Sequence, residues 1–483
     1  MAARSWRPVR APIAGQRLPF KEFCMQLSFR WSRVAVALGA AALMMAPLSG
    51  LLEGAFQVLR GGGSVGGVSI DASGIVREPE IDTTKQFLDD LRKAVKEAPS
   101  ALAAPVPMRK VSLRGLEAAI QDAQTNEFGR LPDEVQFLGG LQRIEYVLVD
   151  RENHDIILAG PAEGWRIDET GNVVGSTSGR PVLRLDDLIV ALRAANAARE
   201  VGISCSIDPT PEGVRQAQSV LDQQRRSRTS VAPNRLGPAL KEAMGPQTVT
   251  ITGVSPSTHF ARVMLAADFH MKRLAMGVVR SPVSGLPSYI DMLASASGPM
   301  PNPRWWLACN YEGVSRNEEG TIWKVRGAGV KTLTEENRTR ADGSSEAQSG
   351  RTSQLARKWA DAMTEQYDAL SLKMPVFGEL RNVMDMSVVA AIIDMYRLRE
   401  MAECPLPILF DTSSPLAAEA WHSPRSVDTV CSFAPTRGGW LVATAGGVQI
   451  ESWQVADAAK PDPAVAELAS HMKRSGGATW WWN

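Results

Sequence analysis

The sequence predicts a mixed α/β fold in which short β-hairpins pack against helices, followed by a long αα-hairpin and a C-terminal β-meander. Two observations support this prediction. The 483 residues are 44% hydrophobic and 22% charged, as in an average globular protein. Segments with strand-like patterning are followed several times by segments with a 3.6-residue apolar period. This repeated order of strand and helix is typical of layered α/β proteins.

Residues 61–135 are predicted to form an N-terminal hairpin and two helices. The run GGGSVGG at 61–67 is a flexible joint. A short hairpin is expected at 68–76, before two helices that an Ala/Pro-rich linker separates. The helices are expected at 83–98 and 112–126, and the linker at 99–107.

Residues 136–334 are predicted to form the α/β core. The helix at 259–274 shows 3.6-residue spacing of its apolar residues, and Pro211 suits the first turn of another helix. A further helix is expected at 188–198. Strands are expected at 143–149, 156–159, 165–167, 173–174, 203–207, 248–252, 304–310 and 321–325.

The C-terminal part is divided by a polar, Gly/Ser-rich stretch at 335–352, which we expect to be an exposed loop. Residues 353–455 are predicted to form the αα-hairpin and then the β-meander. Pro375 separates the two helices of the hairpin. The strands of the meander are expected at 429–433, 440–444 and 448–452, and a short helix is expected from Ala464 within residues 456–483.

The chain ends with Trp480, Trp481 and Trp482. Chain ends commonly fray, so a tail without a role is one interpretation. Each tryptophan ring can bury roughly 150–250 Å². The alternative is therefore that the tail docks into a groove of this protein, a partner or the membrane interface.

Residues 1–60 are predicted to be a targeting segment. The apolar run at 34–48 follows a basic region, as in a secretory signal, and Met25 is the more ordinary start for such a signal. We expect the mature chain to begin between Gly50 and Gly61. An uncleaved membrane anchor and a mitochondrial transit peptide are the alternatives.

The charge distribution argues against a nucleic-acid partner. Seven of the 53 basic residues and one of the 52 acidic residues lie in residues 1–33, so the rest of the chain carries a net charge of −5. A body with this charge has no field that attracts nucleic acid. We expect contact with a membrane only through the N-terminal segment, if that segment is not cleaved.

The familiar catalytic and metal-binding patterns do not fit. The glycines at 61–66 match G-x-G-x-x-G and G-x-S-x-G, but no strand precedes them and no helix follows. His259 and His270 would lie roughly 16 Å apart along one helix, too far for a shared metal. The acidic segment at 168–172 is predicted to be a hairpin turn rather than a calcium-binding loop. We therefore predict no catalytic residue, metal or cofactor.

Four cysteines follow the predicted signal: Cys205, Cys309, Cys404 and Cys431. Buried free thiols are one interpretation of all four. Two disulfides are the alternative in an oxidising compartment. If one disulfide forms, we favour a bond between Cys404 and Cys431.

Basic and aromatic side chains supply the candidate binding residues. Adjacent Trp305 and Trp306 on a strand must point to opposite faces, so one should be buried. Trp306, Trp323 and Arg326 could line a small-ligand site, and cations of the helix at 259–274 should face solvent or the rim of a cleft. The predicted binding residues are Arg262, Lys272, Arg273, Arg304, Trp306, Trp323 and Arg326.

Several long stretches resemble a domain-of-unknown-function family of exported proteins that is found mainly in planctomycetes. These stretches are FLGGLQRIEYVLVDRENHDIILAGPAEGWRIDETGNVVGSTSGRPVLRLDDLIVALR (137–193), GISCSIDPTPEGV (202–214), TVTITGVSPSTHFARVMLAADFHMKRLAMG (248–277), RWWLACNYEGVSRNEEGTIWKVRGAGVKTLTE (304–335) and ADAMTEQYDALSLKMPVFGELRNVMD (360–385). The resemblance covers most of residues 68–435. It implies an exported bacterial protein and supplies no activity, cofactor or catalytic residue.

The sequence thus favours an exported protein of the cell envelope, the periplasm or the medium, with a structural or interaction role and a protein or glycan partner. One alternative is an exported hydrolase with an unrecognised site, and the other is a small-ligand-binding protein. Polar residues that converge in a pocket with shifted pKa values would favour the enzyme. A broad exposed apolar patch would favour the interaction role.

Overall fold

The structure is a computed structural model of the whole chain. It describes residues 65–78, 86–126, 131–227, 233–293, 302–339, 345–348, 354–413, 421–434, 440–467 and 479–483. The chain divides into two units, residues 1–52 and 53–483, and all described elements belong to the second. The predicted targeting segment at 1–60 lies outside the described residues.

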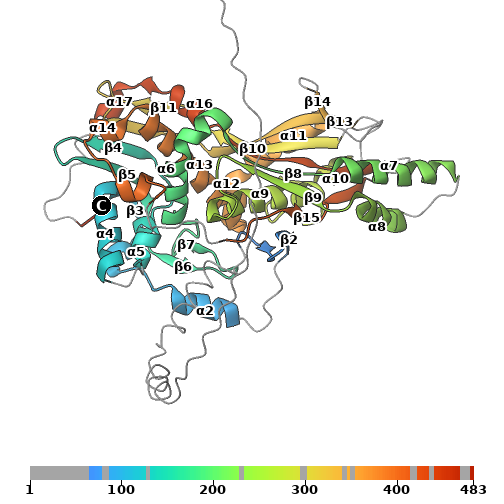
Figure 1. Cartoon of the computed structure of the whole chain (residues 1–483), viewed down its shortest axis with the longest axis horizontal. Helices are drawn as coiled ribbons and strands as arrows, with labels where there is room; N and C mark the ends of the chain where they lie inside the picture. The colour runs from blue at the N-terminus through green and yellow to red at the C-terminus, as the bar shows by residue number, and fades with distance from the viewer. Residues whose placement is uncertain are drawn as a thin grey trace, which may run out of the picture. The chain divides into compact units, whose positions relative to one another are not determined.

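Two large β-sheets contain most of the strands (Figure 1). The nine-stranded sheet has the order β1-β2-β15-β9-β8-β18-β10-β13-β14. Its strands are β1 (Ser69–Ile70), β2 (Ile75–Arg77), β8 (Ile203–Asp208), β9 (Gln247–Thr252), β10 (Asn302–Asn310), β13 (Gly329–Thr339), β14 (Ser345–Gln348), β15 (Ser426–Val427) and β18 (Ala445–Ile450). Its neighbours are antiparallel apart from the parallel pairs β2–β15 and β10–β18.

The seven-stranded sheet has the order β19-β11-β12-β4-β5-β3-β20, with β11 and β19 parallel. Its strands are β3 (Val106–Ser112), β4 (Tyr146–Asp150), β5 (Asp155–Ala162), β11 (Val314–Arg316), β12 (Ile322–Val325), β19 (Lys460–Pro461) and β20 (Trp481–Trp482). Two small hairpins complete the strands: β6 (Trp165–Ile167) with β7 (Val173–Gly175), and β16 (Cys431–Ala434) with β17 (Trp440–Ala443).

Helices α6 and α13 lie between the two sheets (Figure 1). The helices are α2 (Gln86–Ala94), α3 (Ser100–Ala103), α4 (Leu113–Asn126), α5 (Asp133–Gln136), α6 (Leu185–Val201), α7 (Pro211–Arg226), α8 (Pro233–Met244), α9 (His259–Ala275), α10 (Tyr289–Leu293), α11 (Gln354–Glu365), α12 (Tyr367–Lys373), α13 (Pro375–Met395), α14 (Leu398–Met401), α15 (Pro407–Phe410), α16 (Ser452–Asp457), α17 (Pro463–Ala466) and the 3₁₀ turn η1 (Leu138–Gly140).

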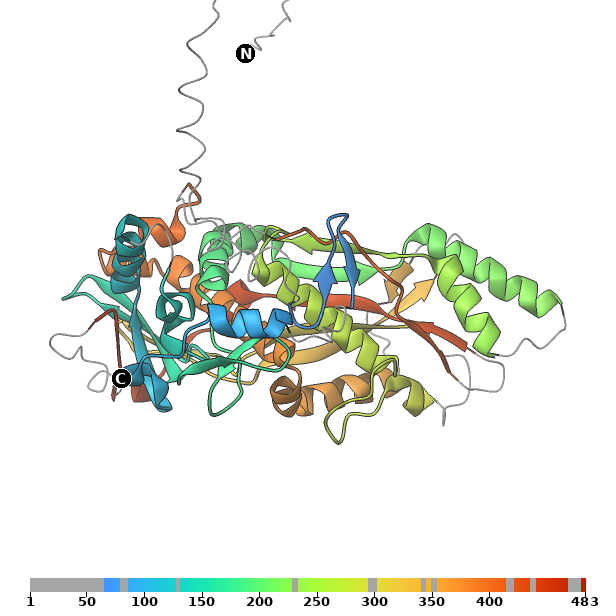
Figure 2. The same ribbon diagram turned by 90° about the horizontal axis from the view of Figure 1, so that it is seen from below.

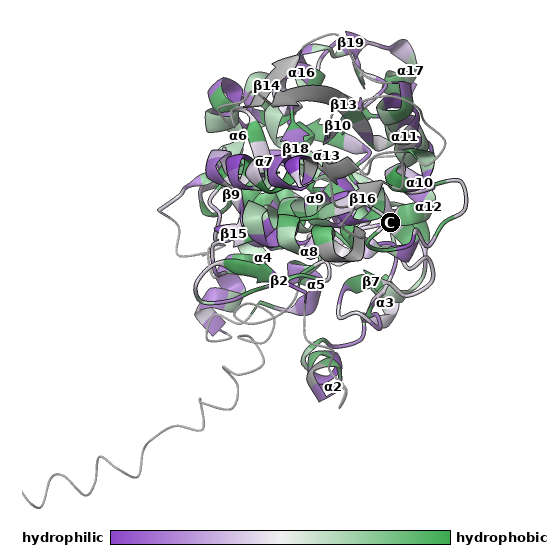
Figure 3. Ribbon diagram, turned by 90° about the vertical axis from the view of Figure 1, so that its right-hand side faces the viewer, coloured by the Kyte–Doolittle hydropathy of each residue, from purple (hydrophilic) through white to green (hydrophobic). Residues whose placement is uncertain are grey.

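Helix α13 forms the centre of the core. Every side chain from Val376 to Ile393 is buried, and the helix packs against α6, α9, α12 and α16. Apolar residues lie on every side of this helix, which favours burial on all sides. Neighbouring α9 is also mostly hydrophobic, whereas α7 is mostly hydrophilic (Figure 3).

The first described residues pack beside α9 (Figure 2). Val65 and Val68 are buried, and Gly66 lies against Ala266 of α9 and Val376 of α13. The His270 Nε2 atom lies 2.6 Å from the Gly66 carbonyl oxygen. Burial is the main cause that lowers the pKa of His270 to about 4, so this imidazole is neutral at pH 7 and donates to the carbonyl.

The predicted mixed α/β class is confirmed. The hairpin expected at 68–76 is the pair β1–β2, and α9 covers the helix expected at 259–274. Pro211 stands in the first turn of α7, where Thr210 caps the helix by accepting a hydrogen bond from the Gly213 amide.

The loop expected at 335–352 is wrong where the structure describes it. Strand β13 continues to Thr339 and pairs with β14, Thr339 opposite Ser345. β10 also extends along β13 as far as the pair Asn302–Asn337. Backbone pairing on both sides of β13 therefore forms a strand despite the polar, Gly/Ser-rich composition that indicated a loop.

The predicted long αα-hairpin also differs from the helices that the structure shows. The first helix breaks at Gln366 into α11 and α12. Helix α12 packs on α13, whereas α11 packs on β13. The break lets the apolar side of α11, which includes Trp359 and Met363, cover the sheet rather than the next helix.

The prediction of a C-terminal β-meander is wrong for its last strand. β16 and β17 form a hairpin, but β18 inserts into the nine-stranded sheet between β8 and β10. Gly446 makes this insertion possible, because its φ is 120° and a Cβ there would lie 1.8 Å from the Trp305 carbonyl oxygen. The predicted linker at 99–107 likewise contains α3 and the first residues of β3.

The tryptophan tail docks on the protein's own sheet as β20, which supports the docking alternative. Trp481 and Trp482 lie opposite Val111 and Lys110 of β3, and Trp482 is only 6% exposed. The Arg109 guanidinium lies 5.5 Å from the centre of the Trp481 ring, and its Nε donates to the Asn483 side-chain oxygen over 2.8 Å.

The favoured disulfide between Cys404 and Cys431 does not form. Both residues are free thiols. Cys404 belongs to the main core, whereas Cys431 packs against a separate cluster that includes Leu240 of α8. Within the described ranges, none of the helices combines the length and the apolar character that are needed to cross a bilayer.

Candidate functional site

A pocket of about 780 Å³ lies between the two sheets. It is lined by β10 and β13 of the nine-stranded sheet, by β11 and β19 of the seven-stranded sheet, and by one side of α16. We call this space the inter-sheet pocket. Its lining includes Ala308, Lys331, Lys460 and Asp462. Its volume lies within the range of ~300–1,000 Å³ that small organic ligands occupy in proteins.

Charged side chains of both signs reach the inter-sheet pocket in equal number. The cations are Arg326, Lys331 and Lys460, and the anions are Glu312, Glu451 and Asp462. A pocket with this balance favours neither a polyanion nor a polycation.

Some of these charges already have partners. Arg326 Nη2 donates to Ser315 Oγ over 3.1 Å and lies 3.8 Å from Asp462 Oδ2. The Glu451 carboxylate accepts from the side-chain amides of Gln449 and Gln454.

Three pocket charges have no such partner. In the described part of the chain, Lys331, Lys460 and Glu312 form no ion pair. These two ammonium groups and one carboxylate are therefore the groups that a ligand can pair with.

A buried network fixes the inner wall of the pocket. The Tyr311 hydroxyl donates to Asp385 Oδ1 over 2.7 Å, and Arg143 donates to both oxygens of Asp385 over 2.8 Å each. Arg143 also donates to the Gly327 carbonyl oxygen over 3.0 Å. The network joins α13 to the turn after β10 and so holds Tyr311 in place.

The protonation states in this network follow from the contacts. Burial lowers the pKa of the Arg143 guanidinium, but the charge and hydrogen bonds of Asp385 outweigh burial and raise it above its ordinary value. Burial and the Asp385 charge both raise the pKa of Tyr311. At neutral pH the network therefore contains a charged guanidinium and a neutral phenol.

The lining offers binding groups rather than an activated nucleophile. Burial raises the pKa of the Cys309 thiol to about 12, so it stays protonated at neutral pH and is a poor nucleophile. The residues that line the inter-sheet pocket include no histidine that could act as a base. What the pocket offers is ion pairing, hydrogen bonding and apolar contact with Leu333 and Val455.

The structure separates the three residues expected to form a small-ligand site. Arg326 lines the inter-sheet pocket, but Trp306 and Trp323 belong to different sheets and are not among its lining residues. Trp323 is 1% exposed; its ring centre lies 4.3 Å from that of Tyr396, and its indole N–H donates to the Gly320 carbonyl oxygen. Trp323 is therefore a core residue.

The structure brings Arg304 and Trp306 together on one face of β10. The guanidinium lies 4.7 Å from the centre of the Trp306 ring and 3.5 Å from Asp208 Oδ1. Trp305 is fully buried and Trp306 is partly exposed, as the alternation of side chains along a strand predicts. The pair Arg304–Trp306 lies outside the lining of the inter-sheet pocket.

Lys272 does not face solvent, so that prediction is wrong. It is fully buried, and its Nζ donates to Asp268 Oδ2 over 2.9 Å and to the carbonyl oxygens of Ile207 and Gly446. Burial raises the pKa of Asp268, and the Lys272 charge opposes that rise. The sequence pattern could not show the two carbonyl partners, because they come from β8 and β18.

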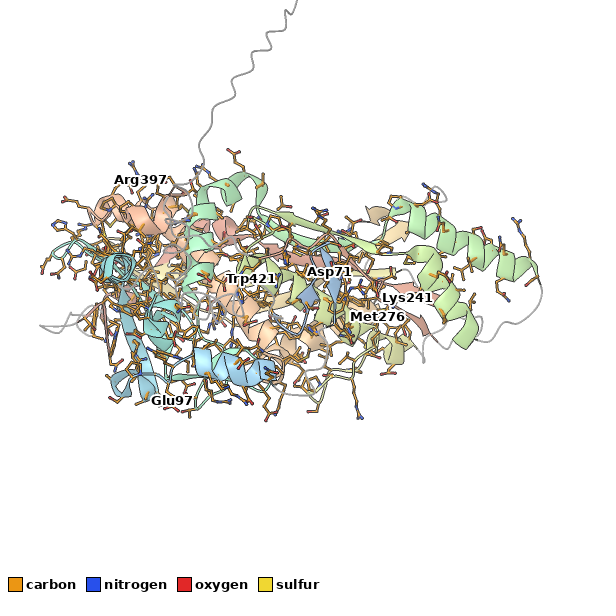
Figure 4. The ribbon with its side chains drawn as sticks, turned by 60° about the horizontal axis from the view of Figure 1, so that its bottom comes forward. Asp71, Glu97, Lys241, Met276, Arg397 and Trp421 are labelled. Atoms are coloured by element: carbon orange, nitrogen blue, oxygen red, sulfur yellow. The ribbon has the colours of Figure 1, made fainter. Side chains whose placement is uncertain are left out.

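Arg262 is buried as well, again against expectation. Its guanidinium lies 4.3 Å from the centre of the ring of Trp421, which is buried too and is labelled in Figure 4. Less than one helical turn earlier, His259 Nδ1 lies 2.9 Å from Asp187 Oδ2, and both side chains are buried. Burial raises the pKa of Glu379, and the charge of His259 opposes the rise.

Arg273 is the most exposed of the three cations predicted on α9. It pairs with Glu78 and lies 5.2 Å from the centre of the Phe269 ring. Its contacts tie α9 to the end of β2 and lie outside the lining of the inter-sheet pocket.

The three pocket residues without an ion-pair partner, Glu312, Lys331 and Lys460, were missed by sequence reasoning. They come from the turn after β10, from β13 and from β19, which meet only in the folded chain. No spacing or motif in the sequence connects them. Among the residues that the structure describes, no group of three His, Cys, Asp or Glu side chains could hold a metal ion.

Comparison with known proteins gives one match. Residues 205–289, less than a fifth of the chain, match the model of a family described as "Protein of unknown function (DUF1598)". No curated protein and no solved structure matches the chain. The matched segment includes α7, α8, β9 and α9, with Arg262 and Lys272, and does not include the residues that line the inter-sheet pocket. The match supports a resemblance to an uncharacterised domain-of-unknown-function family.

Proposed function

We propose that this protein binds, in the inter-sheet pocket, a small ligand that carries an anionic and a cationic group on a partly apolar body. The observation behind this proposal is the set of unpaired Lys331, Lys460 and Glu312 around a space of about 780 Å³. The lysines would pair with a carboxylate, and Glu312 would pair with an ammonium group.

The apolar part of the lining favours the same ligand. Leu333, which is 43% exposed, and Val455 line the pocket beside the charged groups. Burying such surface contributes about 25 cal/mol per Å² to binding. A ligand with charges of both signs and an aliphatic portion uses all three kinds of lining group.

The interaction role predicted from the sequence has less support. Among the described residues, the large apolar side chains that are exposed are Val201, Val278, Leu333 and Leu372, which lie on different parts of the fold. Single exposed apolar residues do not form an interaction surface. The pocket therefore supports binding of a ligand better than docking through an apolar patch.

Calorimetric titration tests the proposal. We expect the zwitterionic tripeptide Ala-Leu-Ala to bind, and its N-acetylated, C-amidated form to bind at least ~10-fold more weakly, because each lost ion pair in a partly buried site removes on the order of 1 kcal/mol or more. Lys331→Ala should weaken binding of the zwitterion, and Lys373→Ala, an exposed lysine on α12, should not. Equal binding of the two peptides, or no binding, would contradict the proposal.

We also propose that the protein is exported, as its N-terminal sequence predicts. The basic residues of 1–33 followed by the apolar run at 34–48 support this. Mass spectrometry of the protein made in a bacterial host should find an N-terminus between Gly50 and Gly61. An intact Met1 or Met25 terminus on cytosolic protein would contradict export with cleavage.

A further inference from the structure

A second hollow of about 580 Å³ lies on the other side of α16. It shares Gln454 with the inter-sheet pocket, so the two spaces meet at this side chain. Trp453 and Asp457 of α16 line the second hollow, whereas Val455 and Ala458 line the inter-sheet pocket. One short helix therefore separates two hollows, and Gln454 lies at the crossing.

The second hollow has a fixed aromatic wall. The Trp453 indole N–H donates to the Ala195 carbonyl oxygen over 2.7 Å, which sets the orientation of the ring. The Arg199 guanidinium lies 5.4 Å from the ring centre. Guanidinium groups stack on tryptophan in this way, so Arg199 is held over the ring as a cation beside the hollow.

The second hollow also has unpaired charges of both signs. Asp394 and Asp457 line it and, within the described ranges, form no ion pair. Arg397, at the margin of the molecule in Figure 4, lies 3.4 Å from Glu400 and is 76% exposed, so solvent screens that pair. The hollow thus offers Arg199 to an anion and two carboxylates to a cation.

We infer that the ligand is a peptide that lies across α16 and occupies both hollows; this inference rests on the proposed function of the inter-sheet pocket. An α-helix with its side chains is roughly 10 Å across, and an extended chain spans about 3.3 Å per residue. About three extended residues span the width of α16, so a tripeptide held in the inter-sheet pocket needs about three further residues to reach the second hollow. The shortest peptide that uses both is therefore about six residues long.

The groups at the crossing suit a peptide backbone. The Gln454 side-chain nitrogen donates to Glu451 over 3.1 Å, which leaves the side-chain oxygen to accept a hydrogen bond. A peptide supplies an N–H at that point and side chains of both charges on either side. A neutral glycan supplies hydroxyls only, which would leave Lys331, Glu312 and Asp457 without counter-charges when it covers them.

A comparison of peptide lengths tests the inference on the full chain. The probes are Ala-Leu-Ala and the octapeptide Ala-Leu-Glu-Gly-Glu-Phe-Lys-Ala, in which the side-chain carboxylate of the third residue replaces the C-terminal carboxylate of the tripeptide. Both are measured by calorimetry against the wild type and the variant Arg199→Ala. We expect the octapeptide to bind at least ~10-fold more tightly than the tripeptide, because the second hollow is reached within one molecule. Arg199→Ala should reduce that ratio to near one and leave tripeptide binding unchanged. Arg357→Ala, at an exposed position of α11, is the matched control.

The outcomes separate the inference from the proposed function. If the tripeptide binds and the octapeptide binds no better, or if Arg199→Ala does not change the ratio, the peptide inference is wrong and the proposed function stands. If neither peptide binds, both are wrong. Tighter binding of chitohexaose than of the octapeptide would overturn the inference in favour of a glycan.

Discussion

The docked tail allows a stability test of one side chain, Trp482. Its ring is 6% exposed in β20 and packs in a small cluster with Val465 of α17 and Tyr146 of β4. A tryptophan ring buries roughly 150–250 Å². At about 25 cal/mol per Å² this burial stabilises the fold by ~4–6 kcal/mol relative to an exposed ring.

The substitution Trp482→Ala should cost less than this gross value, because alanine keeps part of the burial and the tail can fray. Large-to-small replacement of buried tryptophan costs about 3–5 kcal/mol in proteins, and we expect a loss in that range. β20 forms the edge of the seven-stranded sheet, so the variant should also uncover β3. Part of the loss then comes from Arg109, whose guanidinium loses the Trp481 ring if the tail detaches.

Urea unfolding followed by circular dichroism at pH 7 measures the loss without relying on tryptophan fluorescence. Val201→Ala is the control, since Val201 is 59% exposed on α6 and should change stability by less than about 0.5 kcal/mol. If Trp482→Ala unfolds at the same urea concentration as the wild type, β20 is not docked in solution and the argument from burial is refuted.

Three further predictions concern the core. Asp385→Ala should destabilise the fold by about 3–5 kcal/mol, because it leaves a buried guanidinium without its partner, whereas Asp361→Ala, at an exposed position of α11, should change little. Met264→Asp should cost several kcal/mol, on the order of an unpaired buried charge. Because the pKa of His270 is about 4 in the fold and about 6.5 when unfolded, the unfolded chain takes up the proton first as pH falls, and the fold should lose about 1.4 kcal/mol per pH unit between pH 6.5 and 4. His270→Gln should reduce that loss, and His154→Gln, a half-exposed control, should not.

Each of these has an outcome that contradicts it. An Asp385→Ala variant as stable as Asp361→Ala would mean that Arg143 reaches water. If Met264→Asp melts at the same temperature as the wild type, α9 does not pack as described. If the unfolding free energy of His270→Gln falls as steeply with decreasing pH as that of the wild type, His270 does not cause the acid sensitivity.

The sequence by itself determined the elements whose residues carry a strong local pattern. The apolar period of α9, the Thr210-Pro211 start of α7 and the alternation of Trp305 and Trp306 depend on neighbours within one or two turns, so each was predictable. The mixed α/β class followed from the order of such elements. The basic and apolar pattern of residues 1–48 likewise predicts export without any tertiary information.

Tertiary structure alone decided which strands become neighbours and which charges become buried. The insertion of β18 beside β10 depends on the close approach at Gly446, and the strand β13 depends on pairing from both sides despite its polar sequence. The sequence predicts Lys272 as a surface residue, whereas the fold buries it against carbonyl oxygens of β8 and β18. The inter-sheet pocket combines segments as distant as β10 and β19. Contacts between residues far apart in the chain carry no local pattern, and this is why the candidate site was visible only in the folded molecule.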